Sequence, residues 1–312
     1  MIVRGDARQI PLRDDSVQCV VTSPPYFQLR DYSCGAREIG NEDTPEEYVA
    51  ALLEAFREVR RVLRHDGVLW LVLGDSSWGA TPRQRALKHP VLKPKDLIGM
   101  PWRVALALQA DGWYLRADVI WAKPNPMPDP VGDRPSRSHE YVFLLSKSRN
   151  YYYGADAIAE LTVSDHPSAN RFIGRHDQRH GHRGTNTGWN DIGGRRNRRD
   201  VWLVASDKSS EAHYAAFPAQ LVRLCVLAGS RPGDLVLDPF AGSGTVGEVC
   251  SHLSRRWVGV ELSAEHAALA WRRTAQTGFP FKESIDPRID AFPDASAEAA
   301  DKTSAKPQRL RC

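Results

Sequence analysis

The sequence predicts an α/β fold, an open Rossmann-like sheet with helices on both faces. Short apolar runs typical of buried strands alternate with longer stretches of helical periodicity, and Val17 to Val21 followed by Thr44 to Arg64 is the first such pair. Later in the chain, a glycine-rich loop joins an apolar run to a helical pattern, and the next apolar run ends in an acid. A chain of 312 residues can bury one substantial core with an insertion, or two domains.

The composition is that of an ordinary globular protein. The net charge is +4 and 26% of the residues are charged, so a surface that attracts nucleic acid has to be local. The sequence shows no secretory signal and no apolar run near the ~20 residues of a membrane span, so we expect a soluble cytoplasmic protein. The cysteines form no C-x-x-C pair, which argues against a zinc site and a disulfide framework. They are Cys19, Cys34, Cys225, Cys250 and Cys312.

A proline-stiffened loop, Thr22-Ser23-Pro24-Pro25-Tyr26, follows the first apolar run. Proline has a fixed φ and no backbone N–H, so the pair ends the strand and holds an extended loop whose carbonyls face outward. Ser23 adds a hydroxyl and Tyr26 an aromatic face, a set suited to holding a flat polar ring and its exocyclic amine. On its own the string also fits a plain turn.

The glycine-rich loop is Asp238-Pro239-Phe240-Ala241-Gly242-Ser243-Gly244, between a strand-like run and a helical pattern from Thr245 to Leu253. Glycines at such a junction let the backbone approach a ligand closely. The next apolar run, Trp257 to Val260, ends in Glu261, where an acidic side chain holds the hydroxyls of a nucleotide ribose. Strand, loop, helix, strand and acid in this order indicate a nucleoside cofactor.

With these two loops the chain resembles the DNA amino-methyltransferases, which modify cytosine N4 or adenine N6 with S-adenosylmethionine. The resemblance covers roughly residues 1 to 275. The catalytic loop comes first and the cofactor loop last, which matches the circularly permuted β group. The resemblance assigns catalysis to Ser23, Pro24, Pro25 and Tyr26, and cofactor binding to Asp238, Pro239, Phe240, Gly242, Ser243, Gly244 and Glu261.

The N-terminal stretch, Met1 to Ala7, predicts a strand that runs into Gly5-Asp6. In an unpermuted family member, the strand after the ribose-binding acid carries such a Gly-Asp pair, so its place here locates the permutation. The resemblance therefore puts Asp6 near the adenine of the cofactor. A turn aspartate is the alternative.

Two stretches predict loops with basic residues. Residues 27 to 43 lack periodicity and are expected over the active site, where Arg30 is either a phosphate contact or a solvated arginine. Trp78 to Pro94 is irregular and is expected to be a mobile loop that reaches a phosphate backbone, or a solvated loop without a partner. Its basic residues are Arg83, Arg85, Lys88 and Lys93.

A helix is predicted from Thr44 to Arg64, with Thr44 as N-cap and Glu47 closing a capping box. Gly67 is expected to end this helix before a buried strand from Val68 to Leu73. Pro101 to Ala110 predicts a further helix.

Two strands are predicted in the middle of the chain, from Leu115 to Trp121 and from His139 to Ser146. The Trp-x-Lys-Pro-Asn block at the end of the first resembles a segment that borders the target-base pocket in the family. Trp121 and Asn125 are therefore candidates for the wall of that pocket. Asp133 and Arg134 in the intervening loop equally fit a structural ion pair.

Residues 154 to 210 are rich in arginine and glycine, and little in them could form a core. Arginine suits bidentate contacts with guanine edges and phosphates, and each good base contact contributes roughly 1–3 kcal/mol of discrimination. The resemblance places the target-recognition region here. The H-x-x-x-H-x-H string at 176 to 182 is a weak alternative signal for a metal, because no cysteine is adjacent and glycine linkers rarely hold ligands rigidly. The candidate DNA contacts are Arg171, Arg175, Arg195, Arg196, Arg198 and Arg199.

The cofactor half begins with the stretch His213 to Pro218. The resemblance implies that Phe217 closes over the methionine end of the cofactor. A hydrophobe that merely starts the helix from Ala219 to Ala228 is the alternative. A last helix is predicted from Ala264 to Arg273. We therefore predict a catalytic half at 1–153, a target-recognition insertion at 154–210, a cofactor-binding half at 211–282 and a disordered tail at 283–312.

The resemblance implies methyl transfer to a base in double-stranded DNA, and it leaves open a cognate restriction endonuclease and the oligomeric state. A base amine inside a duplex cannot reach the cofactor, so the nucleotide has to be flipped out. We expect it to stack on Tyr26 and to hydrogen-bond Ser23 Oγ and the Pro24 carbonyl, with direct in-line transfer and no cysteine nucleophile.

The target amine is a further choice. Family members with serine at the first loop position mostly modify cytosine N4, so N4 is favoured and adenine N6 is the alternative. An RNA or protein methyltransferase is disfavoured by Ser23, the permutation and the arginine-rich insertion. A catalytically silent DNA-binding protein is disfavoured because the catalytic and cofactor elements are intact.

Overall fold

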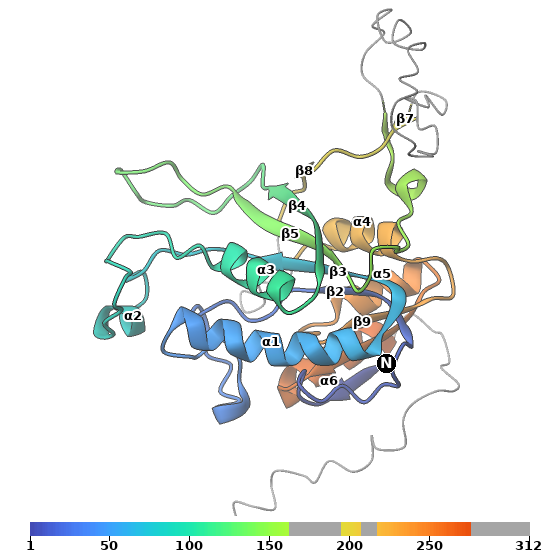
Figure 1. Ribbon diagram of the computed structural model, residues 1–312, viewed down its shortest axis with the longest axis horizontal. Coiled ribbons are helices and arrows are strands. Elements are labelled where there is room, and N and C mark those ends of the chain that lie inside the picture. The colour runs from blue at the N-terminus through green and yellow to red at the C-terminus, as the bar shows by residue number, and fades with distance from the viewer. Residues whose placement is uncertain (162–194, 207–216, 276–312) are drawn as a thin grey trace, which may run out of the picture.

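The computed structural model describes residues 1–161, 195–206 and 217–275, and these build an eight-stranded sheet with the order β1-β10-β9-β2-β3-β5-β4-β8 (Figure 1). The predicted α/β sheet is confirmed. The strands are β1 (Ile2–Arg4), β2 (Val17–Thr22), β3 (Leu63–Leu73), β4 (Tyr114–Ala122), β5 (His139–Ser146), β8 (Val201–Leu203), β9 (Leu235–Asp238) and β10 (Arg256–Glu261).

The direction of the strands gathers many loops at one edge of the sheet. Strands β1, β10, β9, β2 and β3 are parallel neighbours, so their carboxyl ends lie together. Strand β5 is antiparallel to both β3 and β4, so the start of β5 and the end of β4 lie at the same edge. Ligands bind at this edge in open α/β sheets.

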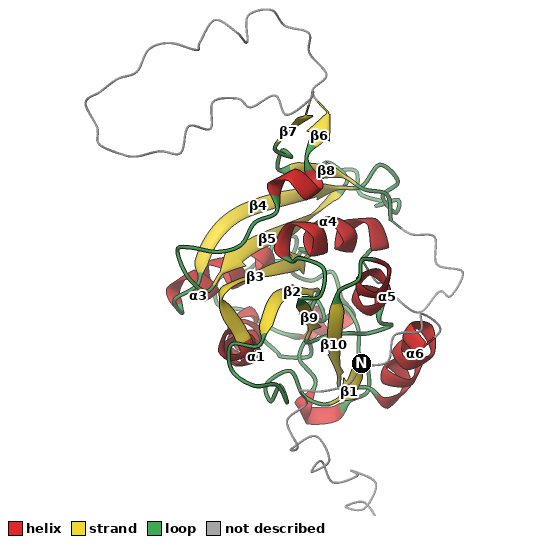
Figure 2. Cartoon of the chain, turned by 90° about the vertical axis from the view of Figure 1, so that its right-hand side faces the viewer, coloured by secondary structure: helices red, strands yellow, loops and turns green. Residues whose placement is uncertain are grey.

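Helices cover both faces, as predicted (Figure 2). Helices α1 (Pro45–Val62) and α3 (Met100–Ala110) pack on one face, where Leu69 and Leu71 of β3 join their core. Helices α4 (Ala219–Gly229) and α5 (Thr245–His252) pack on the other, against Val68 and Trp70. Because alternate side chains of a strand point to opposite faces, each central strand contributes to both cores. Helix α6 (Ala264–Ala275) lies beside α5 and contacts β1 and β10.

The first helix begins as predicted and ends earlier. Thr44 and Glu47 form both bonds of the capping box, with Pro45 in the first turn. The prediction that Gly67 ends the helix is wrong, because the helix stops at Val62 and β3 starts at Leu63. Leu63 pairs with Val17 of β2, so the chain joins the sheet at Leu63, four residues before Gly67.

The stretch from Trp78 to Pro94 is more ordered than predicted. Helix α2 (Pro82–Ala86) has its own capping box, in which Thr81 and Gln84 exchange hydrogen bonds. Trp78 is buried, and Arg83 pairs with Asp43 at 2.8 Å. Local capping and one buried aromatic therefore fold a stretch that has no hydrophobic periodicity.

Part of the arginine-rich region belongs to the body of the protein. A short 3-10 helix, Ala155–Ile158, precedes a two-stranded ribbon of β6 (Glu160–Leu161) and β7 (Arg195–Arg196), and β8 then pairs in parallel with β4. A second 3-10 turn, Gly35–Arg37, lies in the loop before α1. In the described ranges, no helix is long and apolar enough to cross a membrane.

Candidate active site

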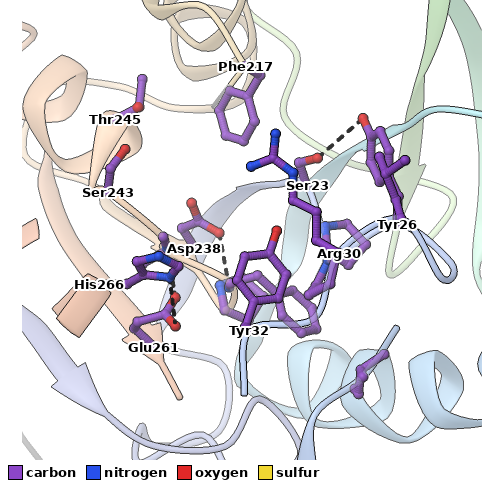
Figure 3. A pocket seen from close by; sticks show the side chains of 18 of the residues that line it. Ser23, Tyr26, Arg30, Tyr32, Phe217, Asp238, Ser243, Thr245, Glu261 and His266 are labelled. Carbon is purple, nitrogen blue, oxygen red and sulfur yellow. Dashed lines mark hydrogen bonds and ion pairs between the residues drawn. The ribbon is translucent and has the colours of Figure 1, made fainter. Parts of the chain in front are cut away.

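A cavity of about 700 Å³ opens at the carboxyl edge of the sheet (Figure 3). It brings together the two loops that lie more than two hundred residues apart in the sequence. The predicted site residues that line it are Asp6, Ser23, Pro24, Pro25, Tyr26, Trp121, Asn125, Phe217, Asp238, Pro239, Phe240, Gly242, Ser243 and Glu261.

Asp238, at the end of β9, is a buried acid at the centre of the cofactor half. Its Oδ1 accepts hydrogen bonds from Thr22 Oγ1 at 2.7 Å and from the Phe240 N–H at 3.1 Å. Burial raises the pKa of Asp238 to about 7, against the lowering effect of these two bonds. A cationic group in the cavity would compensate this buried carboxylate.

Glu261, at the end of β10, faces the glycine-rich loop. Its two carboxylate oxygens accept from the N–H groups of Ser263 at 2.9 Å and Gly242 at 2.8 Å. Gly242 has a φ of +50°, a conformation that favours glycine, and this turns its N–H toward the acid. A carboxylate oxygen has two lone pairs, so each oxygen keeps capacity for a ligand hydroxyl.

Gly244 has a different place from the rest of its loop. It is the N-cap of α5 with a φ of +83°, and it is not among the described residues that line the cavity. A Cβ at this position would lie 3.0 Å from the Cβ of Ala270. The glycine therefore permits close packing of α5 against α6.

Asp6 and Phe217 border the cavity from other segments. Asp6 Oδ2 pairs with Arg8 at 2.7 Å, and although burial opposes it, hydrogen bonding to Arg8 holds the pKa of Asp6 below its usual value. Phe217 immediately precedes the N-cap of α4 and its ring faces the cavity above Ser23 and Asp238 (Figure 3).

The loop before α1 reaches across the cavity, as predicted. Arg30 and Tyr32 from this loop line the cavity together with His266 of α6. The rings of Tyr32 and His266 meet edge to face at 5.6 Å between centroids. Tyr32 and His266 were missed by sequence reasoning, since one lies in an aperiodic stretch and the other on a regular helix.

The Ser-Pro-Pro-Tyr loop is held at several points. The Tyr48 hydroxyl of α1 donates to the Pro25 carbonyl at 2.8 Å. Ser23 Oγ donates to the Tyr26 hydroxyl at 3.5 Å, and the latter donates to Glu140 Oε2 at 2.5 Å. The Tyr26 ring packs against Gly74, where an added Cβ would lie 2.6 Å from Tyr26 Cε2.

Glu140 and Lys123 are cavity residues that sequence reasoning missed. They form an ion pair, and the Lys123 ammonium lies 4.3 Å from the centre of the Trp121 ring. Glu140 is directly opposite Trp121 in the β4–β5 pairing. The signal for Glu140 was an acid at the start of a largely apolar strand, and such an acid belongs to no recognised motif.

Asn125 and Trp121 tie the cavity wall to the segment after β8. Asn125 and Ser206 exchange two hydrogen bonds, of 3.0 and 3.2 Å. Trp121 Nε1 donates to the Val204 carbonyl at 2.8 Å. Asp133 and Arg134 do not pair with each other, since Asp133 bonds Lys95 and Arg134 bonds Asp129.

Among the candidate DNA contacts whose side chains the structure describes, Arg196, Arg198 and Arg199 do not line the cavity. Arg196 and Arg199 both pair with Glu160 Oε1, at 2.9 and 2.7 Å, and Arg198 donates to the Ile158 carbonyl. Arg195 belongs to β7. Arg171, Arg175 and the three histidines of the 176–182 string lie outside the described residues. Within those residues, no group of three or more metal-ligating side chains is present.

Comparison with known proteins agrees with this geometry. A family model described as DNA methylase matches residues 17–272. The type II methyltransferase M.SmaI of Serratia marcescens is 49% identical over 87% of this chain and 89% of its own. The type II methyltransferase M.Cfr9I of Citrobacter freundii is 43% identical over 87% of this chain and 86% of its own.

Solved structures share the fold. The PvuII DNA methyltransferase, described as cytosine-N4-specific, has a TM-score of 0.63 and 20% identity, covering 93% of this chain and 89% of its own. A DNA modification methylase from Thermus thermophilus, described as putative and complexed with S-adenosyl-L-methionine, has a TM-score of 0.57 and 25% identity. That match covers 88% of this chain and 93% of the other.

Proposed function

Because the chain belongs to the N6/N4 DNA methylase family, we propose that it is a site-specific DNA methyltransferase that transfers a methyl group from S-adenosylmethionine to cytosine N4. The observation that carries the proposal is one cavity shared by Asp238, Glu261, Ser23 and Tyr26. Its volume lies in the range of ligand sites and suits a cofactor with a base beside it.

The residues present fit S-adenosylmethionine, which supplies an activated methyl group when bound. Glu261 has acceptor capacity for the ribose hydroxyls, and Asp6, which lines the same cavity, would border the adenine end. The ammonium and sulfonium of the cofactor suit the buried Asp238 carboxylate. Phe217 would cover the methionine end.

The catalytic loop would hold the target base. Flipping the nucleotide out of the duplex costs a few kcal/mol, and stacking of its base on Tyr26 offsets roughly 1–3 kcal/mol of this cost. Hydrogen bonds from the amine to Ser23 Oγ and the Pro24 carbonyl favour a pyramidal nitrogen whose lone pair points at the methyl group. Transfer is then an in-line displacement that depends on positioning and electrostatics.

Cytosine N4 is favoured over adenine N6 by the first loop residue, Ser23, which is a neutral donor and acceptor. The Lys123 ammonium on the same cavity wall adds a donor. Cytosine has a carbonyl oxygen that such a donor can bind, and adenine has none.

Residues 154–210 are proposed as the target-recognition insertion between a catalytic half at 1–153 and a cofactor half at 211–282. Their arginines would contact phosphates and base edges of double-stranded DNA, with Arg196 and Arg199 exchanging Glu160 for phosphate. The relatives M.SmaI and M.Cfr9I are type II methyltransferases, which favours a cognate restriction endonuclease as functional partner and action on DNA in the cytoplasm.

Nucleoside mass spectrometry of DNA from cells that express the protein tests the proposal, with Tyr26→Ala as control. We expect N4-methylcytosine that disappears in the control. Detection of N6-methyladenine instead would agree with the mechanism and overturn the assignment of cytosine as the target base. If neither base appears while labelled S-adenosylmethionine still binds, the DNA assignment fails and RNA or protein becomes the substrate to test.

A further inference from the structure

Four side chains on the wall of the cavity form one continuous chain of hydrogen bonds. Ser23 Oγ donates to the Tyr26 hydroxyl at 3.5 Å, and the Tyr26 hydroxyl donates to Glu140 Oε2 at 2.5 Å. Lys123 donates to the other oxygen of Glu140. Each hydroxyl therefore donates in the direction that leads from the catalytic loop to the carboxylate.

The sheet register builds this arrangement. Leu73 of β3 pairs with Tyr141 of β5, so Gly74 and Glu140 follow at adjoining positions beyond that pair. Gly74 leaves the space that the Tyr26 ring fills, and the ring then extends to Glu140. Glu140 and Lys123 are 17% and 20% exposed, so the ion pair is mostly shielded from water but in contact with the cavity.

Methyl transfer to an exocyclic amine leaves a proton to be removed. The nitrogen forms a bond to the methyl carbon as the C–S bond breaks and its electron pair goes to sulfur, so the product nitrogen is cationic until it loses one N–H proton. We propose that Glu140 is the terminal acceptor of that proton, which it receives through Ser23 and Tyr26. This inference rests on the proposed function and adds a role for Glu140.

The transfer balances along the chain. Ser23 Oγ takes the proton from nitrogen and gives its own to the Tyr26 oxygen, which gives its own to Glu140. Tyr26 and Ser23 end as neutral hydroxyls and Glu140 as a neutral acid, which later returns the proton to solvent. Burial, and then the charge of Glu140, hold the pKa of Tyr26 well above its usual value, so Tyr26 conducts the proton and does not store it.

Other acids that line the cavity are engaged elsewhere. Asp6 is paired with Arg8, and Glu38 accepts from the N–H groups of Tyr32 and Cys34. Asp238 and Glu261 are bonded to Thr22 and to the glycine-rich loop. Among the described residues, Glu140 is the lining carboxylate that accepts from the Tyr26 hydroxyl.

The experiment compares Glu140→Gln, Tyr26→Phe and the double variant in single-turnover methylation of unmethylated plasmid DNA that the wild-type enzyme modifies. Glu140→Gln keeps size and a hydrogen-bond acceptor but loses basicity, and Tyr26→Phe keeps the stacking ring but loses the hydroxyl. We expect each single change to lower the rate of methyl transfer by about a hundredfold, with the KM for DNA within about threefold. Because the two groups act in series, the double variant should be no slower than either single variant.

Tyr151→Phe is the matched control, because its hydroxyl bonds Arg116 and lies outside the cavity lining, and its rate should match the wild type. Circular dichroism and S-adenosylmethionine binding of each variant check the fold. A rate for Glu140→Gln or Tyr26→Phe within about twofold of the wild type, or additive losses in the double variant, would overturn the relay. A wild-type enzyme that methylates no base in any DNA would instead refute the proposed function.

Discussion

Thr22 and Asp238 are 216 positions apart in the chain, yet the hydroxyl of one donates a 2.7 Å hydrogen bond to the carboxylate of the other. The bond joins the end of β2, which carries the catalytic loop, to the end of β9, which carries the cofactor loop. Both side chains are buried, so the two halves of the site are held in register by a contact that water does not weaken.

Replacing Thr22 with valine should weaken both the fold and cofactor binding. Removing one partner of a buried hydrogen bond costs about 1–3 kcal/mol, measurable by chemical denaturation. The same change raises the pKa of Asp238 further, so calorimetry at pH 7 should find weaker S-adenosylmethionine binding. Ser251→Ala, which removes a hydroxyl that donates to the Gly247 carbonyl within α5, is the control. Unchanged cofactor affinity in Thr22→Val would contradict the assignment of Asp238 to cofactor binding.

Cofactor affinity should depend on pH through Asp238. A cationic ligand binds the ionised carboxylate, and with a pKa of about 7 that form is a minority at pH 6. We expect binding about tenfold weaker at pH 6 than at pH 8.5, because only about a tenth of the carboxyl is ionised at the lower pH. Calorimetric titrations across this range measure the effect, and Asp238→Asn should bind weakly with little slope. A flat profile in the wild type would exclude Asp238 as the group that pairs with the cation.

The same acid affects stability with the opposite trend. The pKa of Asp238 is raised by folding, from a usual value of 3.8 to about 7, so the native state holds more protons than the unfolded state between these values. The contribution of Asp238 to the free energy of unfolding therefore falls as the pH rises from about 4 to about 7. The free energy of unfolding of Asp238→Asn, measured by chemical denaturation, should lack this dependence on pH. Equal slopes of the free energy of unfolding against pH in the wild type and Asp238→Asn would contradict the prediction.

Gly74→Ala should damage catalysis with little change in cofactor binding. The new Cβ would overlap Tyr26 Cε2 at 2.6 Å, so the ring has to move away from Glu140 and from the base. A displacement of this kind costs about a hundredfold in rate, which single-turnover methylation measures. Gly132→Ala is the control, since a Cβ there meets no atom within 4 Å. Equal rates for the two variants would show that Tyr26 tolerates the shift.

Thr44→Ala should lower stability and leave the reaction unchanged. It removes the side chain that accepts from the Glu47 N–H at the start of α1. Loss of such a cap costs about 1 kcal/mol, equivalent to a Tm lower by about 1–2 °C in a chain of this size. A thermal melt and a methylation assay on one preparation check both parts, and an unchanged Tm would mean that Glu47 alone caps the helix.

Local motifs predicted the structure correctly wherever the residues involved are close together in the sequence. The Ser-Pro-Pro-Tyr loop, the Asp238 loop and the capping box of α1 each depend on residues within a few positions of one another, and their places follow from backbone rules. Seven strands of the main sheet were found by their apolar runs, whereas β8 and the β6–β7 ribbon, within the arginine-rich region, were not predicted. The end of α1 was not, because Leu63 continues the helical pattern and is drawn into the sheet by its pairing with Val17.

Contacts that depend on strand register could not be predicted from the sequence. Glu140 meets Tyr26 because β5 runs antiparallel to β3 at that offset, and a shift of one residue would turn Glu140 to the other face. Tyr32 and His266 meet because the loop between β2 and α1 reaches α6, a contact that no periodicity in the sequence predicts. The short capped helix α2 was missed because the residue it buries is the polar Gln84, which leaves no apolar pattern in the sequence.

In the β6–β7 ribbon, Glu160 is opposite Arg196 and Leu161 is opposite Arg195, so the two ends of the sequence between Leu161 and Arg195 lie side by side. A stretch whose two ends meet on the body of a protein can be replaced by one of another length without moving either strand, and a longer stretch costs little extra closure entropy. The part of the chain proposed to choose the DNA sequence is thus attached like an exchangeable cassette. Specificity could diversify by recombination among relatives while the sheet, the cofactor loop and the catalytic loop are inherited intact.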